Sequence, residues 1–139
     1  MTHKPVAILG AGNVGMALAS AFIAKGESVV FGVPDPGKYA KAVSTLGPAA
    51  RVVKAFNTTG AENMADSRYA GGQPFMPVCG DDAEARKRVL ALATLIGFDA
   101  VDCGDLKAAR YLEPFAMTWI HMAIKLGHGR SFAFARLTR

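Results

Sequence analysis

Three glycines near the start of the chain have a spacing with a clear chemical meaning. Gly10, Gly12 and Gly15 form the pattern G-x-G-x-x-G between an apolar run and a helical stretch. In such a motif the glycines permit a tight turn, a close approach of pyrophosphate to the backbone and close packing of helix on strand. The helix N-terminus adds unpaired N–H groups. The motif therefore predicts a dinucleotide phosphate site at Gly10, Ala11, Gly12, Asn13, Val14 and Gly15.

Polar residues at two further places could complete this site. Asp35 lies twenty positions after Gly15, where many NAD sites carry an acid for the ribose 2′-hydroxyl. It stands between two prolines, so a turn residue or a helix cap is an equal alternative. Asn57 and Thr58 follow the apolar run at 51–56, and ligands bind beyond the carboxyl ends of strands in open α/β sheets. Their alternative role is capping of the next helix.

The sequence offers no obvious side-chain catalyst and no metal-ligand pattern. We interpret His121, in an apolar stretch, as a buried structural histidine rather than a catalyst. Cys79 and Cys103 fall in separate expected strands and are interpreted as reduced thiols. These features are compatible with hydride transfer between two redox cofactors, because the cofactors then carry the chemistry.

Composition narrows the class of protein. A chain of 139 residues with 51% hydrophobic residues is expected to form one packed domain. No apolar run reaches the ~18 residues of a membrane span, so no membrane partner is expected. The net charge of +5 is spread thinly, which argues against nucleic-acid binding. A strand is expected directly after the first residues, so no signal peptide is predicted and the expected location is cytoplasmic.

Apolar runs alternate with helical stretches along the chain. Strands are expected at 5–9, 28–33, 51–56, 75–79 and 98–103. Helices are expected at 14–25, 38–46, 81–96, 106–112 and 115–126, with Pro114 kinking the last one or restarting it. The alternation predicts an α/β fold, a Rossmann-like parallel sheet of about five strands. Residues 1–139 would form a single dinucleotide-binding domain.

The C-terminal part departs from this alternation. The helix at 115–126 is apolar on nearly every side, and such a helix must be covered all round. A second subunit is the expected cover. The tail at 127–139, where Phe132 and Phe134 alternate with small residues, is expected to form an extended arm. Residues 105–139 are therefore predicted to be a helical and extended segment that forms a homodimer.

Several short motifs occur in one order and together resemble a known family. They are Val52–Thr58 (V-V-K-A-F-N-T), Val78–Asp82, Ala109–Pro114, Trp119-Ile120 and Gly129–Phe134. With the glycine motif, they resemble the deazaflavin-dependent NADP reductase family, which is similar to the cytosolic domain of six-transmembrane metalloreductases. The resemblance implies an NADP(H)-binding oxidoreductase with a small-molecule redox partner, a flavin or deazaflavin. The glycine motif would bind the pyrophosphate, and Asn57 and Thr58 would lie near the nicotinamide.

The chain departs from the family pattern at two places. Family members often carry an arginine for the adenosine 2′-phosphate where this chain has Pro34. Lys38 could replace it, or the cofactor could be NAD, so Asp35 and Lys38 are expected to decide between NADP and NAD. The second departure is that strands between 38–46 and 51–56 are absent, roughly two units at ~30 residues each.

The missing units affect both the function and the topology. The chain could be a natural minimal form, a defective copy or an incomplete gene product. The alternative function is a catalytically inactive nucleotide-binding or interaction module. Without those units, the strand at 51–56 is expected beside 5–9, which gives the strand order 2-1-3-4-5. The alternative places 51–56 outside 28–33.

Overall fold

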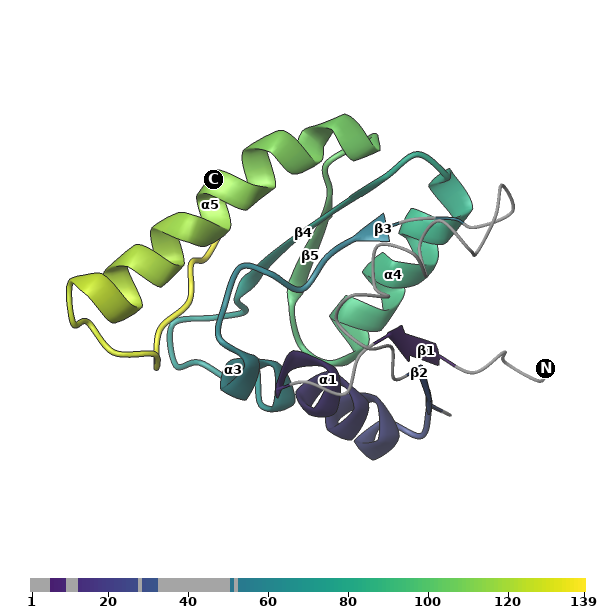
Figure 1. Cartoon of the computed structure of the whole chain (residues 1–139), viewed down its shortest axis with the longest axis horizontal. Coiled ribbons are helices and arrows are strands. Elements are labelled where there is room, and N and C mark those ends of the chain that lie inside the picture. Colours follow the sequence, from purple (N-terminus) through teal and green to yellow (C-terminus); the bar gives the residue numbers. More distant parts are fainter. Residues whose placement is uncertain (1–5, 10–12, 28, 33–50, 52) are drawn as a thin grey trace.

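The computed structural model describes residues 6–9, 13–27, 29–32, 51 and 53–139, which form a mixed α/β fold. Its N-terminal part contains strands β1 (Val6–Leu9) and β2 (Val29–Gly32), with helix α1 (Asn13–Ala24) between them in the chain. The two strands pair in parallel, with Ile8 opposite Phe31. This strand–helix–strand unit is the one that the glycine motif predicts (Figure 1).

A second sheet is built around β4 (Phe75–Gly80). β5 (Asp99–Asp102) pairs with β4 in parallel, and α4 (Ala83–Leu95) connects the two strands. β3 (Val53–Lys54) pairs with β4 on its other side, antiparallel, with Lys54 opposite Cys79. The connection from β3 to β4 contains the short helix α3 (Ala61–Ala65), which the sequence did not lead us to expect.

The predicted strand order 2-1-3-4-5 is not found among the described strands. There, β1 pairs only with β2, and β3 pairs with β4. Neither predicted position of the 51–56 strand, beside 5–9 or outside 28–33, is therefore observed. The direction of β3 gives a physical reason, because an antiparallel pair needs no crossover and the chain can return directly to β4. The regular strand is also shorter than expected, and Phe56 just after it has a φ of 59°.

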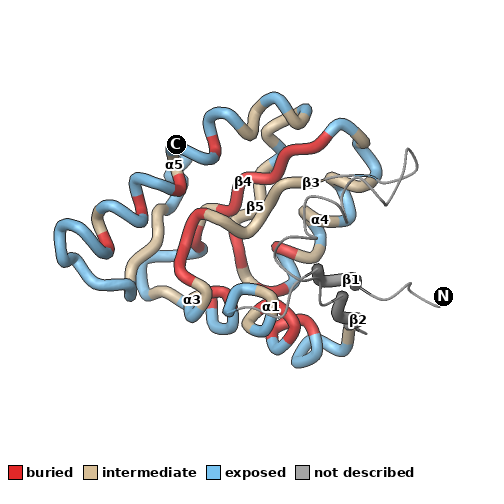
Figure 2. Tube along the Cα trace, in the orientation of Figure 1, coloured by how far each residue is buried: buried red, intermediate tan, exposed pale blue. Residues whose placement is uncertain are grey.

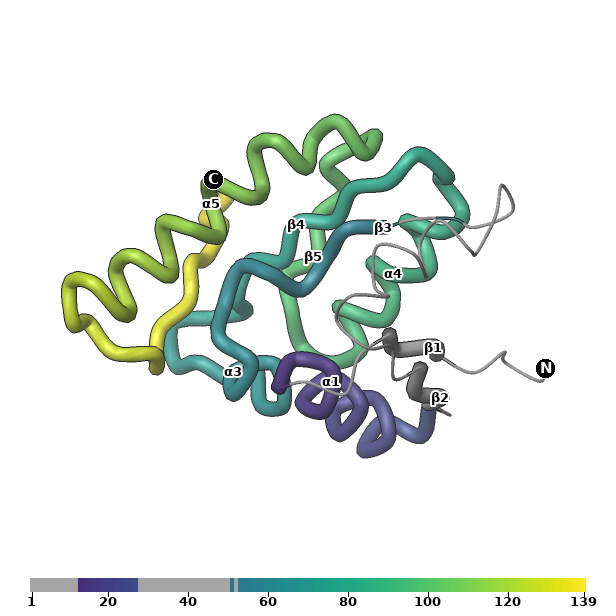
Figure 3. Tube along the Cα trace, in the orientation of Figure 1, coloured from purple at the N-terminus to yellow at the C-terminus, as the bar shows by residue number. Residues whose placement is uncertain are grey.

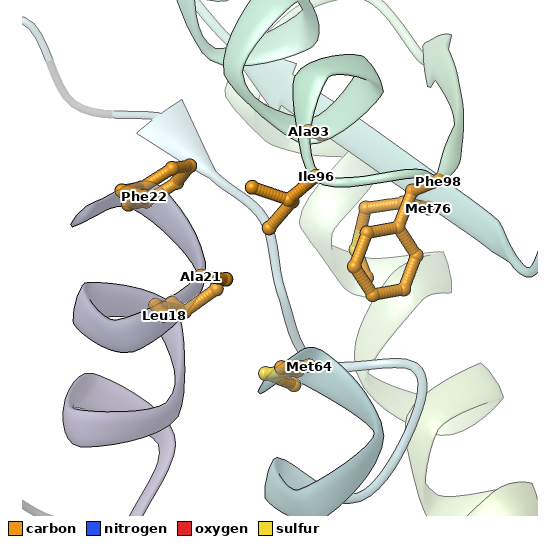
Figure 4. Packing of buried hydrophobic residues seen from close by; sticks show 8 residues of the cluster. All are labelled: Leu18, Ala21, Phe22, Met64, Met76, Ala93, Ile96 and Phe98. Carbon is orange, nitrogen blue, oxygen red and sulfur yellow. The ribbon is translucent and has the colours of Figure 1, made fainter. Parts of the chain in front are cut away.

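Side-chain packing joins α1 to the second sheet in one core. α1, α3, β4 and the end of α4 contribute to a cluster of buried residues: Leu18, Ala21, Phe22, Met64, Met76, Ala93, Ile96 and Phe98 (Figure 4). The Phe56 ring makes edge-to-face contacts with Phe22, at 6.2 Å between ring centroids, and with Phe98, at 6.3 Å. The longest buried stretches of the trace run through β4 and the segment before α3, and one side of α1 is also buried (Figure 2).

The C-terminal helices lie on the face of the second sheet away from α4 (Figure 1). A 3-10 helix, η2 (Leu106–Ala108), leads into α5 (Ala109–Ile120), which continues as the π-helix η3 (His121–Lys125). α5 runs through Pro114 without ending there, so of the two expected effects of this proline, a kink or a restart, the restart is not seen. No helix in the described part of the chain is long and apolar enough to cross a membrane.

The tail after η3 folds back along α5 instead of extending away from the molecule (Figure 3). The indole Nε1 of Trp119 donates a hydrogen bond to the carbonyl of Phe132 at 2.8 Å. The backbone N–H of Phe75, at the start of β4, donates to the carbonyl of Phe134 at 2.8 Å. The aromatic residues of the tail therefore pack on their own chain.

Candidate functional site

The structure describes the residues on either side of the glycine motif. β1 ends at Leu9, and α1 begins at Asn13. Asn13 and Val14 are exposed, and Gly15 is partly buried. Gly10, Ala11 and Gly12 lie outside the described residues, as do Asp35 and Lys38. The flanks have the order strand, motif, helix that a phosphate site at a helix N-terminus requires.

Asn57 is the most unusual polar residue in the described structure. Both its Nδ2 and its Oδ1 are buried, and neither has a hydrogen-bond partner. A buried amide without partners carries an unfavourable desolvation free energy and calls for an explanation. One explanation is a ligand that supplies an acceptor for Nδ2 and a donor for Oδ1. The unsatisfied amide is compatible with the predicted contact between Asn57 and a cofactor.

The residue before Asn57 has a strained backbone. The φ of Phe56 is 59°, a left-handed conformation that is unfavourable for a bulky residue. Its N–H points to the sulfur of Met76, with 3.1 Å between the nitrogen and Sδ. Its ring is fixed between those of Phe22 and Phe98. Core packing thus stabilises the backbone conformation that leads into Asn57, and such strain is often found at functional sites.

Thr58 and Thr59 are fixed within the fold. Thr58 is only 1% exposed, and its hydroxyl donates to the carbonyl of Phe75 at 2.9 Å. Thr59 accepts a hydrogen bond from Nδ2 of Asn63 at 3.0 Å. The hydroxyl of Thr58 is therefore hydrogen-bonded within the protein. Thr58 anchors the segment, and Asn57 carries the free polar groups.

The two cysteines lie beside each other on β4 and just after β5. The N–H of Cys103 donates to the carbonyl of Val78, the neighbour of Cys79, at 2.8 Å. Both are free thiols, and burial raises the pKa of each. They are therefore neutral near pH 7 and poorly suited to act as nucleophiles.

His121 is exposed at the start of η3, so its expected burial is wrong. α5 buries the opposite face, with Leu112, Ala116 and Trp119. His121 instead borders an open surface depression of about 680 Å³ that also contains Glu113, Pro114, Met117 and Thr118. The helix is thus covered on one face by its own chain, and the uncovered face includes the exposed Met117, Ile120 and Ile124.

Comparisons with known proteins agree with the strand–motif–helix order at the glycine motif. Residues 5–67 match the sequence model of the family described as "NADP oxidoreductase coenzyme F420-dependent". The chain is 32% identical over 114 residues to the F420-dependent NADP reductase of Methanocaldococcus jannaschii, with 81% of this chain and 50% of that protein covered. It is 36% identical over 74 residues to the metalloreductase STEAP3 of Rattus norvegicus, with 53% of this chain and 15% of that protein covered.

Solved structures share the fold. A protein from Arthrobacter sp. FB24, provisionally described as an F420-dependent NADP reductase, superposes with a TM-score of 0.79 at 23% identity and covers 96% of this chain and 100% of its own. A hypothetical protein from Sinorhizobium meliloti gives 0.58 at 23% identity and covers 77% of this chain and 88% of its own.

The fold and the motif flanks define an α/β protein of the Rossmann-like class. Together with the relatives, they confirm the resemblance to the deazaflavin-dependent NADP reductase family. The chain spans half the length of the Methanocaldococcus jannaschii relative and a smaller share of the rat one.

Proposed function

We propose that this chain binds NADP(H) and acts as an oxidoreductase that transfers a hydride between the nicotinamide and a flavin or deazaflavin partner. The observation that carries the proposal is the buried, unpartnered amide of Asn57 in a fold related to NADP reductases. A carboxamide or the heterocyclic edge of a flavin offers the donor and acceptor that this amide lacks. The two cofactors supply the redox chemistry, and the protein supplies binding and orientation.

Each residue of the proposed site has a physical role. Gly10, Ala11 and Gly12 would allow the pyrophosphate to approach the backbone, and the start of α1 at Asn13, Val14 and Gly15 would offer N–H groups and the positive end of the helix dipole. Asp35 and Lys38 would select between NAD and NADP through the 2′ position of the adenosine ribose. Asn57 would orient the redox ring, while Thr58 holds the backbone of Asn57 through Phe75.

Nicotinamide fluorescence provides the first test of this proposal. NADPH or NADH titrated into the protein should bind, and Asn57→Ala should bind more weakly than the wild type. Ser20→Ala is a matched control, because Ser20 is exposed on α1 and its hydroxyl only donates to the carbonyl of Met16. Failure of both nucleotides to bind at millimolar concentration would remove the oxidoreductase proposal.

Turnover is the second test, followed as oxidation of NADPH with flavin and deazaflavin acceptors. We expect oxidation to require an acceptor and to be reduced in Asn57→Ala. Binding without turnover for every acceptor would favour the catalytically inactive nucleotide-binding module. A version with the family's additional strands restored would show whether those strands are needed for the reaction.

We also propose that a second copy of the chain covers the free face of the helix at 115–126. Met117 and Ile124 are each 56% exposed, and Ile120 is 38% exposed. Apolar side chains at this spacing form a stripe on one helix face, and its exposure to water is unfavourable. Light scattering should give a dimer mass at micromolar concentration, and Ile120→Glu should give a monomer. Lys125→Glu, just beyond the stripe on η3, is the control and should remain a dimer.

A further inference from the structure

Two bridges connect the C-terminal tail to the residues that follow Asn57. The first bridge passes through Phe75. The N–H of Phe75 donates to the carbonyl of Phe134 at 2.8 Å, and the carbonyl of Phe75 accepts the hydroxyl of Thr58 at 2.9 Å. The rings of Phe115 and Phe134 pack together at 4.9 Å between centroids. One end of the tail therefore holds Thr58 through a single intervening residue.

The second bridge passes through α3. The guanidinium of Arg130 makes a two-pronged ion pair with Glu62, with 3.0 Å between Nη2 and Oε2. The carbonyl of Arg130 accepts a hydrogen bond from Nδ2 of Asn63 at 2.8 Å, and the same amide donates to Thr59 at 3.0 Å. Arg130 thus contacts α3 with both its side chain and its backbone. Asn63 connects Arg130 to Thr59, because its amide donates to both residues.

Arg130 is itself held in place by α5. Its guanidinium carbon lies 5.7 Å from the centroid of the Trp119 ring, a distance typical of a cation–π contact. Trp119 is 4% exposed, and its indole nitrogen donates to the carbonyl of Phe132. The segment 130–134, which we call the tail strap, therefore links the buried side of α5 to α3 and to the start of β4.

The backbone of Gly60 leaves room for this arrangement. A Cβ at Gly60 would lie 2.8 Å from Oε2 of Glu62, closer than a normal contact. The carboxylate of Glu62 therefore sits directly over the residue that follows Thr59, and the absence of a side chain lets it reach Arg130. Gly60 is also the buried N-cap residue of α3.

We propose that Arg130 is a positioning residue for Asn57: the tail strap fixes Thr58 and Thr59, the two residues that follow Asn57, so that the unpartnered amide keeps one orientation before a cofactor binds. This inference rests on the proposed function of Asn57 as a cofactor contact. A ring that must be held in a reactive geometry gains from a partner that is already oriented. Exposed ion pairs add little to global stability, and both Arg130 and Glu62 are about half exposed. The contribution of Arg130 is therefore local.

Arg130→Gln tests this proposal, with Arg136→Gln as the matched control. Arg136 is also a tail arginine with a two-pronged carboxylate pair, but its partner is Asp99 on β5. The first readout is the NMR signal of the Asn57 side-chain amide in the cofactor-free protein. Arg130→Gln should shift or broaden that signal, and Arg136→Gln should leave it unchanged. Arg130→Lys should show an intermediate effect, because lysine keeps the charge without the bidentate geometry.

The second readout is the affinity for NADPH. We expect Arg130→Gln to weaken it by about threefold to tenfold, with the same denaturation midpoint as Arg136→Gln. An unchanged Asn57 amide signal in Arg130→Gln, or an equal change in both variants, would overturn the inference. If the wild-type protein binds no nucleotide, the proposed function fails, whereas the amide signal still tests the positioning by the tail strap.

Discussion

The unit formed by β1, α1 and β2 differs from the part of the chain after Arg51 in how it is held together. The N-terminal unit has two paired strands and contacts the rest through the buried face of α1. In the later part, ion pairs and side-chain hydrogen bonds connect segments far apart in the sequence, such as Arg130 with Glu62 and Arg136 with Asp99. The ion pairs that we find between described residues all lie within 51–136.

This difference separates two tasks within one proposed site. In the proposed site, the glycine motif would act mainly through backbone N–H groups, which need only a strand and a helix in the right order. Orientation of a redox ring would depend on a particular side chain, that of Asn57. The residues before and after Asn57 are held by contacts from β4, α3 and the tail. The proposed phosphate-binding region can thus be formed by neighbouring elements of the chain. The proposed ring-binding region needs contacts between segments far apart in the sequence.

The largest effect is expected from Phe22→Ala, which removes a side-chain contact between the two regions. Phe22 is 2% exposed and packs on Phe56. Loss of a buried aromatic ring should lower the free energy of unfolding by about 3–5 kcal/mol. Denaturant unfolding measures this loss, and Ile23→Ala is the control because Ile23 is 60% exposed. Equal losses in both variants would show that α1 does not join the regions through its Phe22 face.

Asn57→Leu should have a smaller effect. It should increase stability and weaken nucleotide binding. Leucine has a similar size and removes both unpartnered polar atoms, so the free energy of unfolding should rise by about 1–3 kcal/mol. NADPH affinity should fall, because the amide no longer contacts the cofactor. Urea unfolding tests the expected gain in stability, and nucleotide titration tests the expected loss of affinity. A loss of stability would mean that the amide has a partner within the protein.

The smallest effect is expected from lowering the pH. It should reduce the free energy of unfolding through carboxylates in the part of the chain after Arg51. Hydrogen bonds from Arg130 and Arg136 lower the pKa of Glu62 and Asp99, respectively. Both carboxylates then contribute stability that is present above their unfolded pKa, about 4, and is lost as pH falls through the lower folded pKa.

Urea unfolding at several pH values below about 5 tests this expectation. The free energy of unfolding should decrease as the pH falls, and Arg136→Gln should remove part of that decrease. A pH dependence unchanged in Arg136→Gln would contradict the contribution of Asp99.

The sequence predicted local elements better than their arrangement. Apolar runs and glycine positions located β1, α1, β4, α4 and β5 to within a few residues. The direction of β3 depends on the path of residues 55–74, and no periodicity in the sequence encodes that path. α3 is five residues long, too short for a clear helical repeat.

The candidate site could be predicted only in part for a related reason. A polar residue after an apolar run pointed to Asn57, but the burial of Thr58 depends on a carbonyl in another strand. The exposure of His121 follows from which face of α5 meets the sheet, and apolar residues on several sides left that face undefined. The ion pair of Arg130 had no local signal in the sequence, because its partner Glu62 lies 68 positions away.

The position of β5 has a consequence for the behaviour of the protein at high concentration. Among the described strands it is the outer strand of the second sheet, and its sequence is Asp-Ala-Val-Asp. Exposed strand edges can pair with those of other molecules, and charges and short length oppose such aggregation. Asp99 and Asp102 bind Arg136 and Arg86, respectively, which places charged groups at both ends of this edge. A short, charged edge of this kind is a poor template for intermolecular β-sheet growth.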